Sequence, residues 1–243
     1  MSFPEDSIQI LSESWWEKDK EKTIQRGCLV WAYVAYPDQE PLVIEPTGRK
    51  EPREHGGAHV TINKLSISAR RPFHDLPTAA LSLDKRECWA GYRAKKRPCL
   101  VLSCQPLVTG LAKAREKQMA KHLRTSTILV APYYGGDQDG SRGGFPEEFL
   151  EQIRHARCPQ LFFDQLPTDS KVNSSIMRFD HMQTIGSHYN SYELTGYKLT
   201  EEALSVVDEW LDWFIKGGLP SDGIVISYQD LIRECILDVV EKN

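Results

Sequence analysis

The chain has 243 residues, of which 40% are hydrophobic and 26% charged, and its formal net charge is −4. This length can bury a core as one domain, or as one domain with sizeable insertions. No run reaches the roughly 18 apolar residues of a membrane span, and the opening MSFPEDSIQIL lacks the basic start and apolar centre of a signal peptide. We therefore expect a cytoplasmic protein that makes no membrane contact. The negative charge gives no support for nucleic-acid binding by the whole surface.

The six cysteines and seven histidines show no spacing typical of a metal site. Several cysteines lie in apolar runs such as CLVWAYV and PCLVLSC, where a buried thiol is expected. His55 and His59 are four residues apart, but the intervening Gly-Gly disfavours the helix that would align them. We expect reduced, structural cysteines, no bound metal and no cofactor.

The first half of the chain is predicted to be mainly β. After a short, partly helical lead-in, the run CLVWAYVAY is rich in β-branched and aromatic residues and ends at Pro37. Three short candidate strands follow, PLVIEP, HVTINKLSIS and ALSLDKRECWAGY, separated by proline, glycine and charged residues. Pro98 then opens the apolar run CLVLSC, at a strand position where a missing amide is tolerated.

The middle of the chain mixes helix and strand signals. Residues 107–123 have a helix-forming composition, and TILVAPYY is a further strand. The tract GGDQDGSRGG lacks both the GK[ST] ending of a phosphate loop and GxGxxG spacing, so a loop is predicted rather than a nucleotide site. Pro146 and the acidic residues after it favour a short helix that ends at about Arg157.

The last third contains the strands QLFFDQL and SSIMRFDHMQTI and the clearest helix. Thr200 is a suitable N-cap for EEALSVVDEWLDWFIK, and Gly217 follows its last residue. A final helix over 228–241 is indicated by Ser227 with Asp230 three residues later. Short strands without regular βα alternation predict an α+β fold, mainly β, built on a compact antiparallel barrel or sheet.

Five blocks in order resemble the landmarks of the PemK/MazF family of ribonuclease toxins: RGCLVWAYV, KRPCLVLS, STILVAPYY, SSIMRFDHMQTI and LTEEALSVVDEWL. Each block alone is a strand or helix with a common dipeptide, so their order supplies the specificity. The resemblance implies an SH3-like small barrel that forms a homodimer and cleaves single-stranded RNA without a metal. It also implies an antitoxin protein as a partner.

The resemblance implies a site with few catalytic side chains, because the ribose 2′-hydroxyl of the substrate is itself the attacking group. Arg97 occupies the position of the family's catalytic arginine, and a guanidinium matches phosphate oxygens; the alternative is a surface arginine with a packed stem. Tyr134 stands where active relatives carry a small hydroxyl residue. Its reach is longer and its ordinary pKa lies far above neutrality, so either the site works in a changed geometry or cleavage has been lost.

Other residues are secondary candidates. Tyr133 or His181 could take part in a changed geometry, although His181 and Asp180 are adjacent in a predicted strand and would face opposite sides. Gln183 replaces the family's usual basic residue, which removes one phosphate contact.

A basic cluster supplies the candidate RNA contacts. Arg93, Lys95 and Lys96 lie just before Arg97 and could face phosphates. A solvated loop leading into a strand explains such a cluster equally well.

The chain, taken as a single domain over 1–243, departs from the family in size. Insertions are expected at about 37–95 and 135–173, with a helical extension over 218–243. Two functions are therefore expected as alternatives: a toxin-like endoribonuclease, or a catalytically degenerate module that binds nucleic acid or a protein through its insertions. The RNA sequence that would be cut is not readable from this fold.

Overall fold

The computed structural model describes residues 7–49, 51, 53, 57–68, 83, 87–104, 126–138, 143–168 and 174–241. It divides into two compact units. The main unit consists of Met1–Val34 with Lys96–Asn243, and the inserted unit is Ala35–Lys95. The bounds of the inserted unit are close to the range 37–95 named above. The helix predicted over 107–123 lies outside the described residues.

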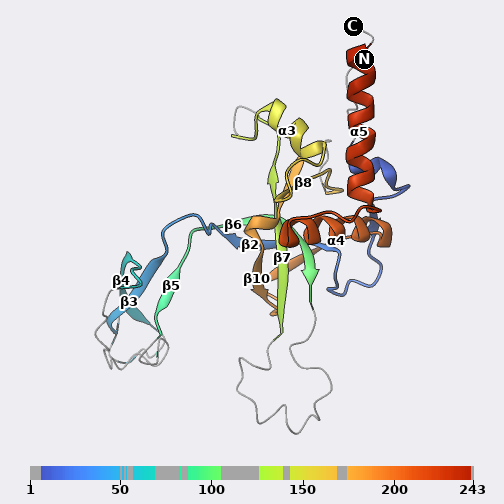
Figure 1. The fold of residues 1–243 in the computed structure, drawn as a ribbon. Coiled ribbons are helices and arrows are strands. Elements are labelled where there is room, and N and C mark those ends of the chain that lie inside the picture. Colours follow the sequence, from blue (N-terminus) through green and yellow to red (C-terminus); the bar gives the residue numbers. More distant parts are fainter. Residues whose placement is uncertain are drawn as a thin grey trace. The chain divides into compact units, whose positions relative to one another are not determined.

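In the described part of the main unit, eight strands form one mainly antiparallel sheet (Figure 1). The α+β class is confirmed. The path of paired strands ends at β1 and β8, so no closed barrel is seen among these strands. The strands along the path are β1 (Trp16–Lys18), β11 (Tyr192–Leu199), β2 (Cys28–Ala35), β6 (Ala94–Ser103), β7 (Thr127–Gly135), β9 (Ser175–Arg178) and β8 (Leu161–Asp164), and β10 (Gln183–Gly186) also pairs with β7.

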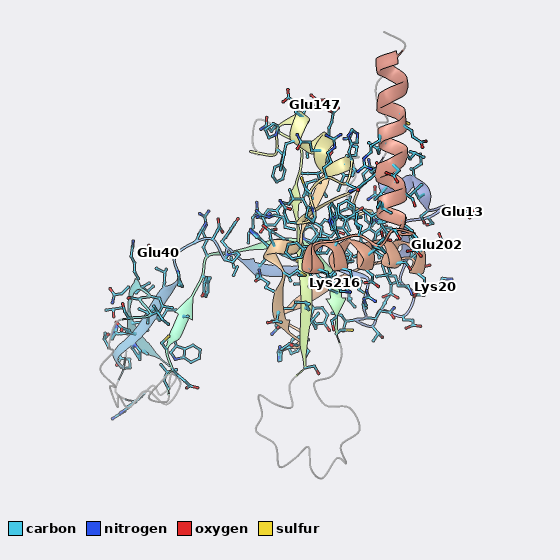
Figure 2. All side chains as sticks on the ribbon, viewed as in Figure 1. Glu13, Lys20, Glu40, Glu147, Glu202 and Lys216 are labelled. Carbon is cyan, nitrogen blue, oxygen red and sulfur yellow. The ribbon has the colours of Figure 1, made fainter. Side chains whose placement is uncertain are left out.

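Alternating residues of β2, β6 and β7 build two separate cores, one on each face of the sheet. The helix face packs against α4 (Glu201–Lys216), and Tyr133 is buried there together with Trp210 of the helix. The other face, here called the valine face, buries Cys28, Val30, Ala32, Val34, Cys99, Val101, Ile128 and Val130. Charged residues of α4, among them Glu202 and Lys216, are exposed (Figure 2).

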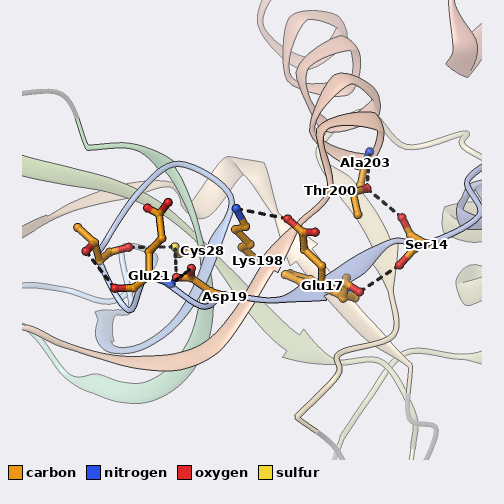
Figure 3. A network of polar contacts seen from close by, with 10 residues as sticks. Ser14, Glu17, Asp19, Glu21, Cys28, Lys198, Thr200 and Ala203 are labelled. Carbon is orange, nitrogen blue, oxygen red and sulfur yellow. Dashed lines mark hydrogen bonds and ion pairs between the residues drawn. The ribbon is translucent and has the colours of Figure 1, made fainter.

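Both ends of α4 are as predicted. The Thr200 hydroxyl accepts a hydrogen bond from the Ala203 amide at 3.3 Å and donates one to the Ser14 carbonyl at 2.9 Å (Figure 3). Gly217 ends the helix with a φ of 78°, a left-handed conformation that glycine adopts without strain. The cap therefore also ties the N-terminal segment to the helix.

Two of the blocks that carry the family resemblance touch each other. Arg26 forms an ion pair with Asp208 of α4. Gly27 has a φ of +84°, and a Cβ there would lie 3.2 Å from a methyl carbon of Leu204. Glycine is thus needed both for the backbone conformation and for the close approach of the helix.

Two other helices of the described main unit differ from their predicted bounds. The short helix α3 spans Glu147–Arg154, inside the predicted range. The last helix, α5, spans Ile224–Glu241 and so begins before the predicted residue 228. Its first amides are bound by Glu209 of α4, through contacts of 2.7 Å to the Ile224 nitrogen and 2.9 Å to the Val225 nitrogen. Glu209, a residue of α4, therefore caps the start of α5, a role that was expected of Ser227.

The described part of the inserted unit forms a three-stranded antiparallel sheet in the order β4-β3-β5. These strands are β3 (Leu42–Arg49), β4 (Ala58–Lys64) and β5 (Trp89–Gly91). They match PLVIEP, HVTINKLSIS and the end of ALSLDKRECWAGY, much of which lies outside the described residues. Among the described residues, no helix is long and apolar enough to cross a membrane.

All six cysteines are free. Cys28 and Cys99 are buried, and burial raises the pKa of Cys28 to about 11 and that of Cys99 to about 12. Both thiols are therefore protonated at neutral pH, as expected for structural cysteines.

Candidate functional site

Arg97 and Tyr134 are cross-strand neighbours on β6 and β7. The strand register pairs Cys99 with Pro132, and continuing it by two residues places Arg97 opposite Tyr134. The guanidinium carbon of Arg97 lies 3.8 Å from the centre of the Tyr134 ring, which is a close cation–π contact. The two residues named from the resemblance therefore meet on the valine face of the sheet.

On the other side of β7, the predicted strand SSIMRFDHMQTI is divided into two strands, β9 and β10. β9 pairs with Tyr133–Gly135, and β10 pairs with Thr127–Val130. Between them, residues 178–182 stand opposite only Ala131 and Pro132 and include the short 3-10 helix η3 (Phe179–His181). Pro132 has no amide hydrogen to offer a partner strand, which suits a break in the ladder at this point.

The break brings His181 to Tyr134. The Tyr134 hydroxyl and His181 Nδ1 are 2.7 Å apart, and the two rings meet edge to face with centroids 5.4 Å apart. His181 is only 7% exposed, and Tyr134 is half-buried. His181 Nε2 lies 3.9 Å from Asp180 Oδ2. Because η3 is helical rather than extended, the expectation that these neighbours would face opposite sides was wrong.

Arg178 is a site residue that sequence reasoning did not find. Its guanidinium carbon lies 5.5 Å from the centre of the Tyr134 ring, and its Nε donates to Asp180 Oδ1 at 3.0 Å. Asp180 is partly buried, which raises its pKa, but the hydrogen bonds and charge of Arg178 outweigh burial and lower the pKa below the usual range. Asp180 is therefore ionised at neutral pH. The only sequence signal was the alternation of basic and acidic residues in RFDH.

Tyr133 is not part of this cluster. It is 2% exposed on the helix face, and its hydroxyl donates to Asp164 Oδ2 at 2.8 Å. Asp164 is fully buried and also accepts hydrogen bonds from the Gln9 side chain at 2.7 Å and the Trp16 indole at 3.2 Å. Burial raises the pKa of Asp164 to about 6, although these donors act in the opposite direction. This group joins the N-terminal segment to β7 and β8.

The expected RNA contacts are spread over the two units. Lys96 belongs to the main unit, where its ammonium is 2.6 Å from Glu193 and 5.8 Å from the centre of the Trp31 ring. Arg93 belongs to the inserted unit and lies over the Tyr36 ring at 5.6 Å, and Lys95 is exposed. The structure therefore places only Lys96 in the same unit as Arg97.

Gln183, the position at which the family usually carries a basic residue, lies beside the cluster. Its partner in the ladder is Val130, whose side chain is on the valine face. The Gln183 amide nitrogen lies 3.4 Å from the backbone oxygen of His181. Gln183 can therefore offer a neutral donor or acceptor at the edge of the site.

The cluster of Arg97, Tyr134, Arg178, Asp180 and His181 joins two guanidinium groups, one carboxylate, an imidazole and a phenol. With a neutral imidazole, the formal charges of these five side chains sum to +1. The guanidiniums suit an anion with several oxygens, and the imidazole suits proton transfer near neutral pH. Among the described residues, no group of three His, Cys, Asp or Glu could hold a metal ion.

The chain was compared with protein-family models, with curated proteins and with solved structures. No family model matches it, and neither of the other two searches finds a similar protein. A proposal about function therefore rests on the geometry of the cluster.

Proposed function

We propose that this chain is a toxin-like endoribonuclease of the PemK/MazF type, which cleaves single-stranded RNA without a metal. The observation that supports the proposal is the meeting of Arg97, Tyr134 and His181 on one face of the sheet. The contacts of Arg26 and Gly27 with α4 add support, because they join the first and last blocks of the resemblance. An SH3-like barrel, a homodimer and an antitoxin partner belong to the same proposal.

The chemistry is set by these groups. The ribose 2′-oxygen attacks the phosphorus, the bond to the 5′-oxygen breaks, and the products are a 2′,3′-cyclic phosphate and a 5′-hydroxyl. Arg97 donates to the non-bridging oxygens, where negative charge develops in the transition state. His181 accepts the 2′-proton at Nε2 while Nδ1–H donates to the Tyr134 oxygen, and the leaving 5′-oxygen takes up a proton from solvent, so protons balance and no oxidant is needed. The Tyr134 hydroxyl holds the imidazole in place through its hydrogen bond.

Cleavage in the presence of EDTA tests the proposal. Wild-type protein, Arg97→Ala and Arg233→Ala are each incubated with a long single-stranded RNA, and the ends are mapped. Arg233 is the matched control because it is an exposed arginine in α5 that pairs with Asp230 at the surface. We expect cyclic-phosphate ends from wild type and from Arg233→Ala, and a rate lower by about 10²–10³ for Arg97→Ala.

Two outcomes would contradict the proposal. Intact RNA at a large excess of wild-type protein would show that the protein does not cleave this RNA. Equal cutting by Arg97→Ala would show that the ends do not depend on Arg97, which contradicts the proposed site. Single-stranded DNA of the same sequence serves as a further control, because it lacks the attacking hydroxyl and should stay intact.

A second candidate function is a binding module without cleavage, and the inserted unit favours it. The register puts Ile44, Ile62 and Trp89 in one row across the three strands. Ile62 is 60% exposed and Trp89 is 42% exposed. Exposed apolar rows of this kind are typical of protein interaction surfaces. Binding of RNA or of a protein by a chain that leaves RNA intact would support this function over the first.

A further inference from the structure

The imidazole of His181 lies between a phenol and a carboxylate. Its Nδ1 is 2.7 Å from the Tyr134 hydroxyl, and its Nε2 is 3.9 Å from Asp180 Oδ2. The first distance is that of a hydrogen bond, whereas the second is too long for one. Asp180 therefore acts on the ring through its charge, and the cleavage step described above assigns no role to this carboxylate.

The ionisations of Asp180 and His181 are coupled. His181 is 7% exposed and the Asp180 side chain is 32% exposed, so water screens this pair less than it screens two surface groups. Burial raises the pKa of Asp180, but the hydrogen bonds and charge of Arg178 lower it, and positive charge on His181 lowers it further. Coupling between two sites is reciprocal, so the Asp180 carboxylate favours the protonated imidazole to the same extent.

The other charged groups of the cluster act in the opposite direction. The guanidinium carbons of Arg97 and Arg178 lie 3.8 and 5.5 Å from the centre of the Tyr134 ring, to which the imidazole is also bound. Positive charges at this range disfavour a positive imidazole. Within the described cluster, the charge that favours protonated His181 thus comes from Asp180.

The remaining elements that pack against η3 bring charged groups that are bound elsewhere. β8 contacts η3 and carries Asp164, which is buried on the helix face. α4 reaches η3 through Phe214, whose ring stacks on Phe179 with centroids 6.1 Å apart. Near this end of α4, Asp212 and Lys216 form an exposed ion pair with each other at 2.6 Å. The titration of the imidazole is therefore governed by the cluster itself.

We propose that Asp180 is a positioning residue for His181, whose carboxylate stabilises the imidazole after the ring has taken the 2′-proton of RNA. The inference rests on the proposed function, because it assigns a role to a further residue of the same site. The 2′-oxygen bonds to phosphorus as its proton passes to Nε2, and the positive charge that appears on the ring lies 3.9 Å from Asp180 Oδ2. Asp180 exchanges no proton, and the imidazole later releases its proton to solvent. The bond from Arg178 Nε to Oδ1, at 3.0 Å, orients the carboxylate.

Two substitutions should move the titration of His181 in opposite directions. Asp180→Asn removes a favourable charge and should lower the titration midpoint of the imidazole by about 1 unit, a tenfold change in its acid dissociation constant. Arg178→Gln removes an unfavourable charge and should raise the midpoint. A purely structural role of the Arg178–Asp180 pair would instead loosen η3 in both variants and move both midpoints towards that of an exposed histidine.

The measurement is an NMR titration of the histidine ring protons in the full chain without RNA. His181→Gln identifies the His181 signal among the seven histidines. Asp180→Glu keeps the charge and should keep the midpoint near its wild-type value. Asp230→Asn in α5 is the control, because it removes an exposed carboxylate that pairs with Arg233 and should leave the midpoint unchanged. Circular dichroism and thermal melting confirm that each variant is folded.

Cleavage by the same variants is then followed in EDTA from about pH 5 to about pH 8. In Asp180→Asn the acid limb of the rate profile should move to lower pH together with the midpoint. The plateau rate should fall by about 3- to 10-fold, because a proton acceptor of lower basicity is less effective. Asp230→Asn should reproduce the wild-type profile.

The outcomes separate this inference from the proposed function. A midpoint that stays or rises in Asp180→Asn overturns the role of Asp180 even if the wild type cleaves RNA. A shift in the same direction in Asp180→Asn and Arg178→Gln overturns it as well. If the midpoint falls in Asp180→Asn but the wild type leaves RNA intact at every pH, the coupling of the two groups is supported and the cleavage proposal is contradicted.

Discussion

Tyr133 and Tyr134 are consecutive residues of β7, and their hydroxyl groups are bound on opposite faces of the sheet. Tyr133 donates to the buried Asp164 at 2.8 Å, and Tyr134 lies 2.7 Å from His181 Nδ1. Alternation along a strand makes this separation unavoidable. The two hydroxyls can therefore be removed one at a time, with different consequences.

Phenylalanine substitutions at these two positions should separate stability from activity. Tyr133→Phe leaves Asp164 without one donor in a dry core and should lower the free energy of unfolding by about 1–3 kcal/mol. Its rate of RNA cleavage should stay near wild type at a temperature where the protein is folded. Tyr134→Phe should lose less unfolding free energy than Tyr133→Phe, because its hydrogen bond to His181 is only partly buried, but it should cleave more slowly. Urea unfolding and single-turnover cleavage give both numbers, and a loss of activity in Tyr133→Phe alone would contradict this division.

Asp164 should make stability depend on pH in an unusual direction. Burial raises its pKa from 3.8 in the unfolded chain to about 6, so the folded protein holds this proton more tightly. The resulting stabilisation is complete below about pH 4 and is lost as the pH rises through about 6, amounting to about 3 kcal/mol.

Asp164→Asn tests this, because an amide nitrogen in place of Oδ2 can donate to the Tyr133 hydroxyl while the remaining oxygen keeps the other donors. The difference in unfolding free energy between wild type and Asp164→Asn, measured in urea from pH 4 to pH 7, should change steadily in favour of the variant. Subtraction cancels the other titrating groups, among them Asp180. A difference that does not vary with pH would show that Asp164 keeps the same pKa in both states.

Glu209 should stabilise the start of α5. Its two carboxylate oxygens bind the Ile224 and Val225 amides, which no earlier turn of the helix can satisfy. Glu209→Ala should therefore cost about 1–2 kcal/mol of unfolding free energy. Asp212→Ala is the control in the same helix, because its exposed ion pair with Lys216 should contribute less than about 0.5 kcal/mol. Equal losses in the two variants would contradict the capping role.

Alkylation should distinguish the cysteines. Cys88 is exposed, whereas Cys28 and Cys99 are buried with pKa values raised to about 11 and about 12. Iodoacetamide at neutral pH should label Cys88 first and leave the two buried thiols unlabelled until denaturant is added. Mass spectrometry of the digested protein reports each site. Early labelling of Cys99 would mean that the valine face opens in the native state.

The sequence predicts those elements whose signals are local. Thr200 and Gly217 set both ends of α4 through their own side chain and backbone, and both ends are predicted correctly. The predicted start of α5 is wrong because its cap comes from Glu209, which is close only after α4 and α5 have packed. β11 is not predicted, since YELTGYKL contains glycine and charged residues and its half-buried positions depend on pairing with β1 and β2.

The site is predictable in part. Arg97 and Tyr134 are named from a resemblance, and their contact follows from strand register, which a single sequence does not fix. Arg178 is not predicted because its position depends on the turn at η3, and SSIMRFDHMQTI has the pattern of one uninterrupted strand. The ladder on β7 is divided opposite Ala131 and Pro132, and Pro132 has no amide hydrogen to donate.

Because the ladder is interrupted, the length of the segment 178–182 determines the register in which β10 pairs with β7. Five residues, 178–182, span a gap that two residues fill on β7. Deleting a single residue there would either unwind η3, and with it the placement of His181, or move β10 by one position. In the second case Ile185 would turn away from the valine face and Thr184 would enter it. For the pairing of this edge, the number of residues in the segment therefore matters more than their type, whereas the candidate site depends on both.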